Sequence, residues 1–347
     1  MAPTSVHRPQ TSHGVMLLPF VLAGVAAFLF QPHGVAQPPK ETSGKGAIVL
    51  WRYALDGLNS AGDAYLVRVN PKDKKDTRLT KKPDEGVPTF PIALSPDGRL
   101  VAYTKVEVDG DNANFAVYVR SLDDLKKAPV GLGVTGYCAC WSADGRQVVT
   151  VNNQDGAFEH FLVDVKSKEK KTLSLPKVAV PEDAKGRVGH VITDWSRDDQ
   201  WFLTMCFSGD EKEEKAQLYR VKCDGSEARA IKGVASGQWG RFAPDGKRIL
   251  YTASDEKGQP RLFIVDVEGG KPFRLSPELN GLVDEAGFCW SPDGKKVAYL
   301  WLNTEKPQFG QEYEMFLMVI DADGNNQVTV LAEKSAFVKP LRYPQWR

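Results

Sequence analysis

The stretch CWSPDGKKVAYLW, residues 289–301, decides how this chain folds, because close copies of it recur along the sequence. Within it, Ser-Pro-Asp-Gly is turn chemistry: Pro fixes φ at the first central position, and Gly accepts the left-handed conformation that closes a hairpin. The alternating apolar run KKVAYLW that follows has the period of a β-strand. Each copy therefore predicts a β-hairpin.

Four further copies precede this one: ALSPDGRLVAYTK, CWSADGRQVVTVN, DWSRDDQWFLTMC and RFAPDGKRILYTA. When Leu94, Trp141, Trp195, Phe242 and Trp290 are taken as equivalent, the spacings are 47, 54, 47 and 48 residues. After each hairpin, a strand-like run such as PRLFIVDVEGG and a last short strand follow, and no helix-length amphipathic pattern occurs. Units of four antiparallel strands at this spacing are typical of β-propeller blades.

The two ends of the repeat region supply the parts of one more blade. AIVLWRYAL, AYLVRVN and DTRLT give three strands near the start, and LRYPQWR gives a lone strand at the end. Joined, they remove the sheet edges that an open array would expose. The predicted fold is all-β, a six-bladed propeller of four-stranded antiparallel blades closed by pairing of the N- and C-terminal strands. The aromatic residues at the repeat position are expected to be core between blades.

The first 36 residues differ from the rest of the chain. Arg8 is their only charged side chain, an apolar run extends from Val15 to Phe30, and Gly34 and Ala36 suit the −3 and −1 positions of a signal-peptidase site. This pattern predicts a cleaved secretory signal peptide, or else an uncleaved membrane anchor, since the run approaches the roughly 20 residues that span a bilayer. In both cases the body of the protein is expected to be periplasmic or secreted.

The W-S-P-D-G-K-x-[IV]-A-Y hairpins resemble the PD40, or WD40-like, propeller repeats of the TolB family. The resemblance covers about residues 46–347, preceded by a linker at 37–45, and the copy WSRDD at 195–199 departs most because it lacks both Pro and Gly. TolB carries an α/β domain ahead of its propeller, whereas only about ten residues separate the predicted cleavage site from the first strand here. The resemblance therefore implies the fold without implying a role in the Tol-Pal system.

Charge and cysteine usage narrow the classes of partner. Without the first 36 residues the chain has 44 Lys+Arg and 44 Asp+Glu, and no basic stripe of the kind that nucleic-acid binders carry. We expect no nucleic-acid partner, a monomer, and membrane contact only through an uncleaved N-terminal segment. The cysteines are expected to be buried free thiols, since Cys138 and Cys140 lie two apart with parallel side chains on one predicted strand.

The sequence offers little catalytic chemistry. No G-x-S-x-G elbow is present, and only His160 and His190 lie beyond the first 36 residues, too few for a multi-His metal site. The acidic stretches Asp109–Asn114 and Asp321–Asn326 alternate carboxylates as calcium loops do, but both lack the downstream Glu and are interpreted as inter-strand turns. We expect no catalytic residue, no metal and no cofactor.

Loops that lead into the innermost strands of a propeller surround one mouth of its channel, so their side chains converge there. On this basis the predicted partner-binding residues are Arg187, His190, Asp194, Trp239, Arg241, Asp284, Glu285, Arg342 and Tyr343. In GQWGRF, regular alternation places Trp239 and Arg241 on one side of their strand and Phe242 on the other.

Two functions from different classes follow. The first is an exported, non-catalytic propeller that binds a peptide or protein partner in the bacterial cell envelope, which rests on the fold that the repeats imply. The alternative is a propeller hydrolase or lyase that holds a metal in its central channel.

Overall fold

The computed structural model describes residues 46–53, 64–80, 91–109, 112–154, 157–176, 178, 187–209, 215–234, 236–278, 280–303, 313–335 and 341–347. The predicted signal segment and linker lie outside these residues. Within them every regular element is a strand, and no helix is long and apolar enough to cross a membrane.

The strands in the described part of the chain are, in order, β1 (Ile48–Tyr53), β2 (Ala64–Val69), β3 (Asp76–Arg78), β4 (Ala93–Leu94), β5 (Leu100–Asp109), β6 (Asn112–Ser121), β7 (Val130–Thr135), β8 (Tyr137–Trp141), β9 (Gln147–Gln154), β10 (Ala157–Asp164), β11 (Lys170–Leu173), β12 (Arg187–Trp195), β13 (Trp201–Gly209), β14 (Lys215–Lys222), β15 (Ala228–Ala230), β16 (Gln238–Phe242), β17 (Arg248–Ser254), β18 (Pro260–Asp266), β19 (Phe273–Arg274), β20 (Leu282–Trp290), β21 (Lys296–Leu302), β22 (Tyr313–Asp321), β23 (Val328–Ser335) and β24 (Leu341–Trp346).

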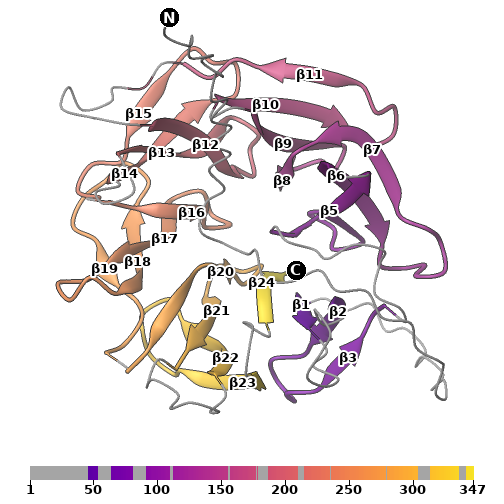
Figure 1. Cartoon of the computed structure of the whole chain (residues 1–347). Coiled ribbons are helices and arrows are strands. Elements are labelled where there is room, and N and C mark those ends of the chain that lie inside the picture. Colours follow the sequence, from indigo (N-terminus) through magenta and orange to yellow (C-terminus); the bar gives the residue numbers. More distant parts are fainter. Residues whose placement is uncertain are drawn as a thin grey trace, which may run out of the picture. The chain divides into compact units, whose positions relative to one another are not determined.

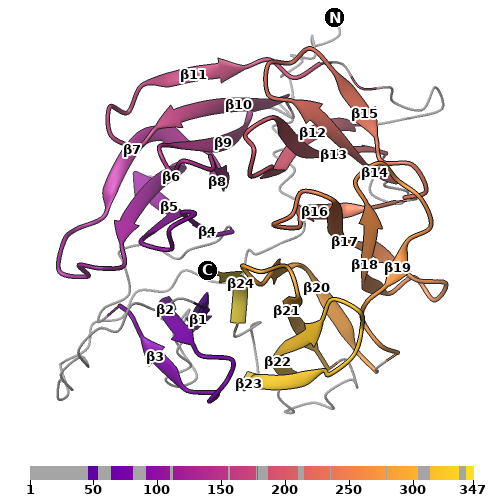
Figure 2. The ribbon, with the colours of Figure 1, turned by 180° about the vertical axis from the view of Figure 1, so that it is seen from behind.

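These strands pair into six four-stranded antiparallel sheets that follow one another around a ring (Figure 1). Blade 1 has the strand order β24-β1-β2-β3, and blades 2 to 6 are the consecutive runs β4–β7, β8–β11, β12–β15, β16–β19 and β20–β23. The first strand of each sheet in this order lies nearest the ring axis, as the reverse view also shows (Figure 2). The predicted six-bladed propeller is confirmed.

Blade 1 closes the ring by combining both ends of the repeat region. β24 pairs antiparallel with β1, with Ile48 opposite Trp346. Just outside the ladder, Gly46 N donates to Arg347 O at 2.8 Å, and Trp346 Nε1 donates to Gly46 O at 3.0 Å. The predicted closure through the terminal strands is therefore confirmed.

The hairpin turns are fixed by side chains as well as by backbone. In blade 6, Ser291 Oγ donates to Asp293 Oδ1 at 2.7 Å and accepts from Lys296 N at 2.8 Å, while Gly294 takes a left-handed φ of 67°. The same hydroxyl-to-carboxylate contact recurs in blades 2, 3 and 4 at Ser95, Ser142 and Ser196. These repeated contacts make the turns of these four blades rigid supports for the innermost strands beside them.

The divergent copy in blade 4 forms the same turn with different residues. Asp199 stands at the glycine position with a φ of 55°, which costs a non-glycine residue energy although Asp tolerates it better than most. Its Oδ1 accepts a hydrogen bond of 2.8 Å from Ala143 N in the turn of blade 3. The departure from the repeat pattern thus adds a contact between blades that a glycine could not make.

Each interface between neighbouring blades contains a hydrophobic cluster in the described part of the chain, including the interface between blades 6 and 1. Four of the five aromatic residues at the repeat position are buried in these clusters, as predicted, namely Trp141, Phe242, Trp290 and Trp346, whereas Trp195 is half-buried against the cluster between blades 3 and 4. Trp141 Nε1 also donates to Ala93 O of the preceding blade at 2.8 Å. The core therefore lies between blades, and each innermost strand is held from both sides.

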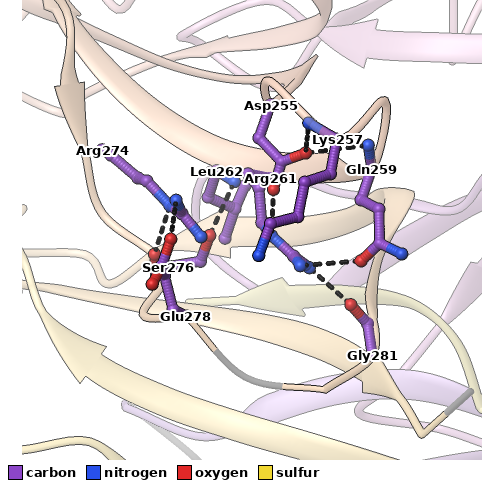
Figure 3. A network of polar contacts seen from close by, with 9 residues as sticks. All are labelled: Asp255, Lys257, Gln259, Arg261, Leu262, Arg274, Ser276, Glu278 and Gly281. Atoms are coloured by element: carbon purple, nitrogen blue, oxygen red, sulfur yellow. Dashed lines mark hydrogen bonds and ion pairs between the residues drawn. The ribbon is translucent and has the colours of Figure 1, made fainter. Parts of the chain in front are cut away.

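A buried ion pair ties blade 5 to the segment that leads into blade 6 (Figure 3). Arg261 Nε lies 3.1 Å from Asp255 Oδ2, Nη2 donates to Gln259 Oε1 at 2.8 Å, and Nη1 donates to Gly281 O. Since Arg261 is only 5% exposed, these contacts offset the cost of removing its charge from water. They fix the position at which β20 begins.

Candidate functional site

A cavity of about 250 Å³ lies on the ring axis, at the end where the innermost strands finish and the hairpin turns begin. Its walls come from equivalent positions of the repeat. The residue before the repeat aromatic lines it from every blade: Ala93, Cys140, Asp194, Arg241, Cys289 and Gln345. The apolar residue that follows completes the wall: Leu94, Trp141, Trp195, Phe242, Trp290 and Trp346.

β-Bulges lie close before the cavity-lining residues in β8, β12, β16, β20 and β24. The pairing register shifts between Cys138 and Cys140 in β8 and between Ile192 and Asp194 in β12, and similar shifts occur in β16, β20 and β24. An extra residue in a strand changes the direction in which the following side chains point. In β8, β12, β16 and β24 the shift ends at the cavity-lining residue, and in β20 it ends at Phe288, one residue before Cys289.

The bulge in β8 separates two cysteines that the sequence places on one side. Cys138 packs in the cluster between blades 2 and 3, whereas Cys140 packs in the cluster between blades 3 and 4 and lines the cavity. The expectation that their side chains run parallel is therefore wrong, because it assumed an unbroken pleat. All five cysteines of the chain are free.

The bulge in β16 likewise separates Trp239 from Arg241. Trp239 has a left-handed φ of 51° and packs against the clusters on both sides of blade 5. Arg241 lines the cavity instead. The prediction that these two side chains share one side of the strand is wrong for the same reason.

Asp194 and Arg241 face each other across the boundary between blades 4 and 5, and backbone contacts hold both. Asp194 Oδ2 accepts a hydrogen bond of 2.7 Å from Phe242 N, and Arg241 Nη1 donates to Thr193 O. Burial raises the pKa of Asp194, and Arg241 and the Phe242 N–H oppose that rise. Trp290 Nε1 donates to Arg241 O at 3.3 Å, which fixes the backbone from the next blade.

Two thiols line the same cavity but are poor nucleophiles. Burial raises the pKa of Cys140 well above its ordinary value, and the nearby Asp194 raises it further. Burial also raises the pKa of Cys289 to about 12. Since the thiolate is the reactive form, both groups are protonated and unreactive at neutral pH.

Two more arginines stand at the rim of the cavity. Arg197 is exposed and occupies the position at which most copies of the turn carry Pro. Arg347 follows Trp346 directly, and its Nε is buried without a hydrogen-bond partner among the described residues. Burial lowers the pKa of Arg347, and Arg197 lowers it further, while Asp194 opposes them.

Of the nine predicted partner-binding residues, the structure brings Asp194 and Arg241 together in the cavity. Arg187 begins β12, at the opposite end of that strand from Asp194, and its side chain lies outside the described residues. His190 is half-buried, with Nε2 2.7 Å from Thr204 Oγ1 within its own blade. Burial lowers the pKa of His190 to about 4, so its imidazole is neutral.

The remaining predicted residues line other parts of the ring. Asp284 is buried, and Glu285 is exposed while its backbone oxygen accepts a hydrogen bond from Thr252 Oγ1 at 3.1 Å. Arg342 is half-buried on the closing strand, and Tyr343 packs against the cluster between blades 1 and 2. None of these side chains borders the 250 Å³ cavity.

The acidic turn at Asp321–Asn326 is held by its own side chains. Asp321 accepts from Asn326 Nδ2 at 2.6 Å and forms an ion pair with Lys296. The other acidic stretch, Asp109–Asn114, falls partly outside the described residues. In the described part of the chain, no three His, Cys, Asp or Glu side chains gather as metal ligands do.

No protein-family model and no curated protein matches this sequence. Among solved structures, TolB from Acinetobacter baumannii is similar, with a TM-score of 0.60 and 17% identity over 86% of this chain and 66% of that one. The fold is a TolB-like β-propeller. A protein assigned as TolB from Agrobacterium tumefaciens gives a TM-score of 0.56 and 16% identity, covering 84% of this chain and 90% of its own.

A protein to which a different function is assigned shares the TolB-like fold. A protein assigned as a 6-phosphogluconolactonase from Bacteroides fragilis gives a TM-score of 0.52 and 15% identity, covering 88% of this chain and 99% of its own. This chain also spans slightly less than two thirds of the length of the Acinetobacter TolB. Because one fold hosts unrelated functions, the similarity does not decide between binding and catalysis.

Sequence reasoning missed Arg197, Arg347 and the thiols of Cys140 and Cys289 as cavity residues. The signal that finds the two thiols is the column directly before the repeat aromatic in the aligned copies, since that column lines the cavity in every blade, and Arg347 is found in the column directly after the aromatic, where most copies carry Ser. Arg197 is found by a second signal, the turn copy in which Arg replaces Pro.

Proposed function

We propose that this TolB-like propeller is an exported, non-catalytic binding protein of the bacterial cell envelope, which takes a peptide or protein partner at its central channel. The observation that carries the proposal is that polar groups from several blades converge on one cavity and are held by backbone contacts. Asp194 is bound to Phe242 N and Arg241 to Thr193 O. Fixed groups of this kind suit recognition, because little conformational freedom is lost on binding.

The groups that line the cavity offer little for catalysis. Protonated thiols and a carboxylate that accepts a backbone hydrogen bond provide neither an activated nucleophile nor a free general base. The pattern of the first 36 residues supports export to the periplasm or beyond. In this proposal the propeller is a monomer, does not bind nucleic acid, and contacts the membrane only if its N-terminal segment stays uncleaved.

Site-specific photo-crosslinking in cells tests the binding site. A photoreactive residue at Ala143, which lines the cavity, should crosslink a partner. The same residue at Val130, which is 49% exposed on the outer strand β7, is the matched control and should not. Crosslinks of equal strength from both positions, or from Val130 alone, contradict the proposal.

Export is tested by sequencing the N-terminus of the protein from fractionated cells. A start at Gln37 supports cleavage, an intact N-terminus in the membrane fraction supports an anchor, and protein confined to the cytoplasm contradicts export.

The second candidate, a hydrolase or lyase with a metal in its channel, is favoured by the fold shared with the lactonase-assigned protein. Metal analysis of the purified protein separates the two candidates. A bound ion at one equivalent favours the enzyme.

A further inference from the structure

The cavity carries an excess of positive charge. Arg197, Arg241 and Arg347 line it, and Asp194 is the one carboxylate side chain among its lining residues. Arg347 O also accepts a hydrogen bond from Gly46 N. Even if the carboxyl group of Arg347 carries a negative charge, the three guanidinium groups exceed the two carboxylates by one.

This excess is not relieved within the described part of the protein. Asp194 already accepts the Phe242 N–H, and one nitrogen of Arg241 already donates to Thr193 O. Arg347 Nε is buried and has no hydrogen-bond partner among the described residues. Like charges held close together in a partly desolvated space repel one another, and a buried donor without an acceptor is costly, so a bound anion would relieve both.

The arginines stand where the chain departs from its own repeat. Arg197 takes the turn position that holds Pro in three other copies, in a sequence that also replaces the turn Gly. Arg347 follows the repeat aromatic, where four of the five other blades carry Ser. Arg197 does not serve the hairpin, because Pro is the residue that the turn favours at this position. Both arginines bring positive charge to one cavity.

The volume of the cavity and its lining residues favour some anions over others. Its volume of about 250 Å³ is below the range of about 300–1,000 Å³ typical of sites for drug-sized ligands, which disfavours a nucleotide. Leu94, Trp141 and Phe242 give it an apolar wall beside the guanidinium groups. A ligand with a carboxylate on a short apolar chain contacts both the guanidinium groups and the apolar wall, whereas inorganic phosphate contacts only the guanidinium groups. Arginine suits a carboxylate because its planar fork can donate two parallel hydrogen bonds.

We propose that this cavity binds a carboxylate-bearing ligand, with Arg347 and Arg197 as its ionic contacts and Arg241 as a further positive wall. The carboxylate belongs to a small organic acid or to an acidic side chain of a peptide. In the second case the proposal rests on the proposed function and states which part of the partner enters the channel.

Calorimetric titration of the purified full chain with its own carboxyl terminus tests the proposal. The probes are succinate, the blocked peptide acetyl-Gly-Asp-Gly-amide, its Asn counterpart, and inorganic phosphate, all at one ionic strength. Succinate or the Asp peptide should bind, and the Asn peptide and phosphate should bind at least tenfold more weakly. A response to succinate alone supports the cavity while contradicting the peptide function, and a response to the Asp peptide alone supports both.

The key variant is Arg197→Pro, which restores the residue that the turn favours and should fold at least as well as the parent. Loss of one charge-assisted contact should weaken carboxylate binding by about tenfold or more. Arg146→Ala is the matched control, because it removes one arginine from an exposed position in the blade 3 turn, outside the cavity. Arg347→Ala should weaken binding at least as much as Arg197→Pro.

Three results would overturn the proposal: no binding of either carboxylate probe, phosphate binding as tightly as the carboxylates, or equal affinities in the parent, Arg197→Pro and Arg146→Ala. Circular dichroism of each variant confirms the β-fold, so that a loss of affinity in an unfolded sample is not counted.

Discussion

Replacing Trp346 by alanine should destabilise the propeller strongly, although the residue stands next to the end of the sequence. Its side chain is 6% exposed, packs in the cluster between blades 6 and 1, and donates through Nε1 to Gly46 O at 3.0 Å. Truncating a buried Trp to Ala costs about 3–5 kcal/mol, because apolar contacts are lost and a cavity remains. Since the residue holds β24 on β1, the loss should appear in the global free energy of unfolding.

Guanidinium unfolding followed by far-UV circular dichroism measures this loss. For a chain of this size we take a denaturant slope of about 5 kcal/mol per M, so the midpoint should fall by about 0.6–1 M. Trp346→Phe keeps most of the ring contacts and removes the Nε1–H donor. It should therefore cost less, about 1–2 kcal/mol.

Trp290→Ala is the matched control, because Trp290 is 5% exposed at the same repeat position of a blade built from consecutive strands. The two alanine variants should lose similar stability. If Trp346→Ala unfolds at the midpoint of the parent while Trp290→Ala falls by the expected amount, the terminal strand does not hold the ring closed and the closure argument fails.

Three further predictions concern other parts of the ring. Asp199→Asn should leave the melting temperature unchanged. Asp199→Ala should lower stability by about 1–2 kcal/mol, because alanine must adopt the same left-handed backbone and cannot accept the hydrogen bond from Ala143 N. Equal melting temperatures of the two variants would contradict the role of Asp199 as this acceptor. Burial lowers the pKa of His160 and His190 to about 4, so the unfolded chain takes up protons that the folded protein does not, and stability should fall from pH 6.5 toward pH 4. The slope is at most about 1.4 kcal/mol per pH unit for each histidine, and urea melts of His190→Gln should show a shallower pH dependence than the parent. Gly136→Ala should prevent folding or cost several kcal/mol, because at a φ of 111° a Cβ atom would lie 2.1 Å from a backbone oxygen of β9, and native-like melting would contradict that geometry.

The number of blades and their closure could be predicted from the sequence because both depend on local patterns. Ser-Pro-Asp-Gly specifies a turn by its own chemistry, and the alternating runs that follow have the period of a strand. Even WSRDD at 195–199, which lacks Pro and Gly, forms the same hairpin, with Asp199 in the left-handed conformation. The three strands at one end and the lone strand at the other completed the sixth blade for the same reason: an open array leaves edges unpaired.

The composition of the cavity could not be predicted in the same way, because it depends on bulges. Alternation assigns side chains to faces only while the pleat is unbroken, and one extra residue reverses the assignment for every residue that follows. This rule places Trp239 and Arg241 on one side of their strand, and the bulge between Gln238 and Arg241 separates them. Bulges leave little trace in a single copy of the repeat. They show only as a column of cavity residues when all blades are compared.

The repeat copies therefore contain two kinds of residue: those that recur because they serve the fold, and those that differ in a single blade. Where most blades agree, as at the turn serines and the aromatics of the repeat position, the residue serves a hairpin or an interface between blades. Blade 4 departs at two turn positions: Arg197 gives up the φ restriction that Pro provides, while Asp199 accepts a backbone conformation that Gly adopts freely and gains the hydrogen bond from Ala143 N. Natural sequences depart from local consistency mainly at sites with another role.

In this propeller the most divergent turn is also the one that brings an arginine to the axial cavity, beside the carboxylate of Asp194. Arg347, whose Nε has no hydrogen-bond partner among the described residues, lines the same cavity. On the proposed function, the degenerate repeat copy marks the binding site and is not decay of the motif.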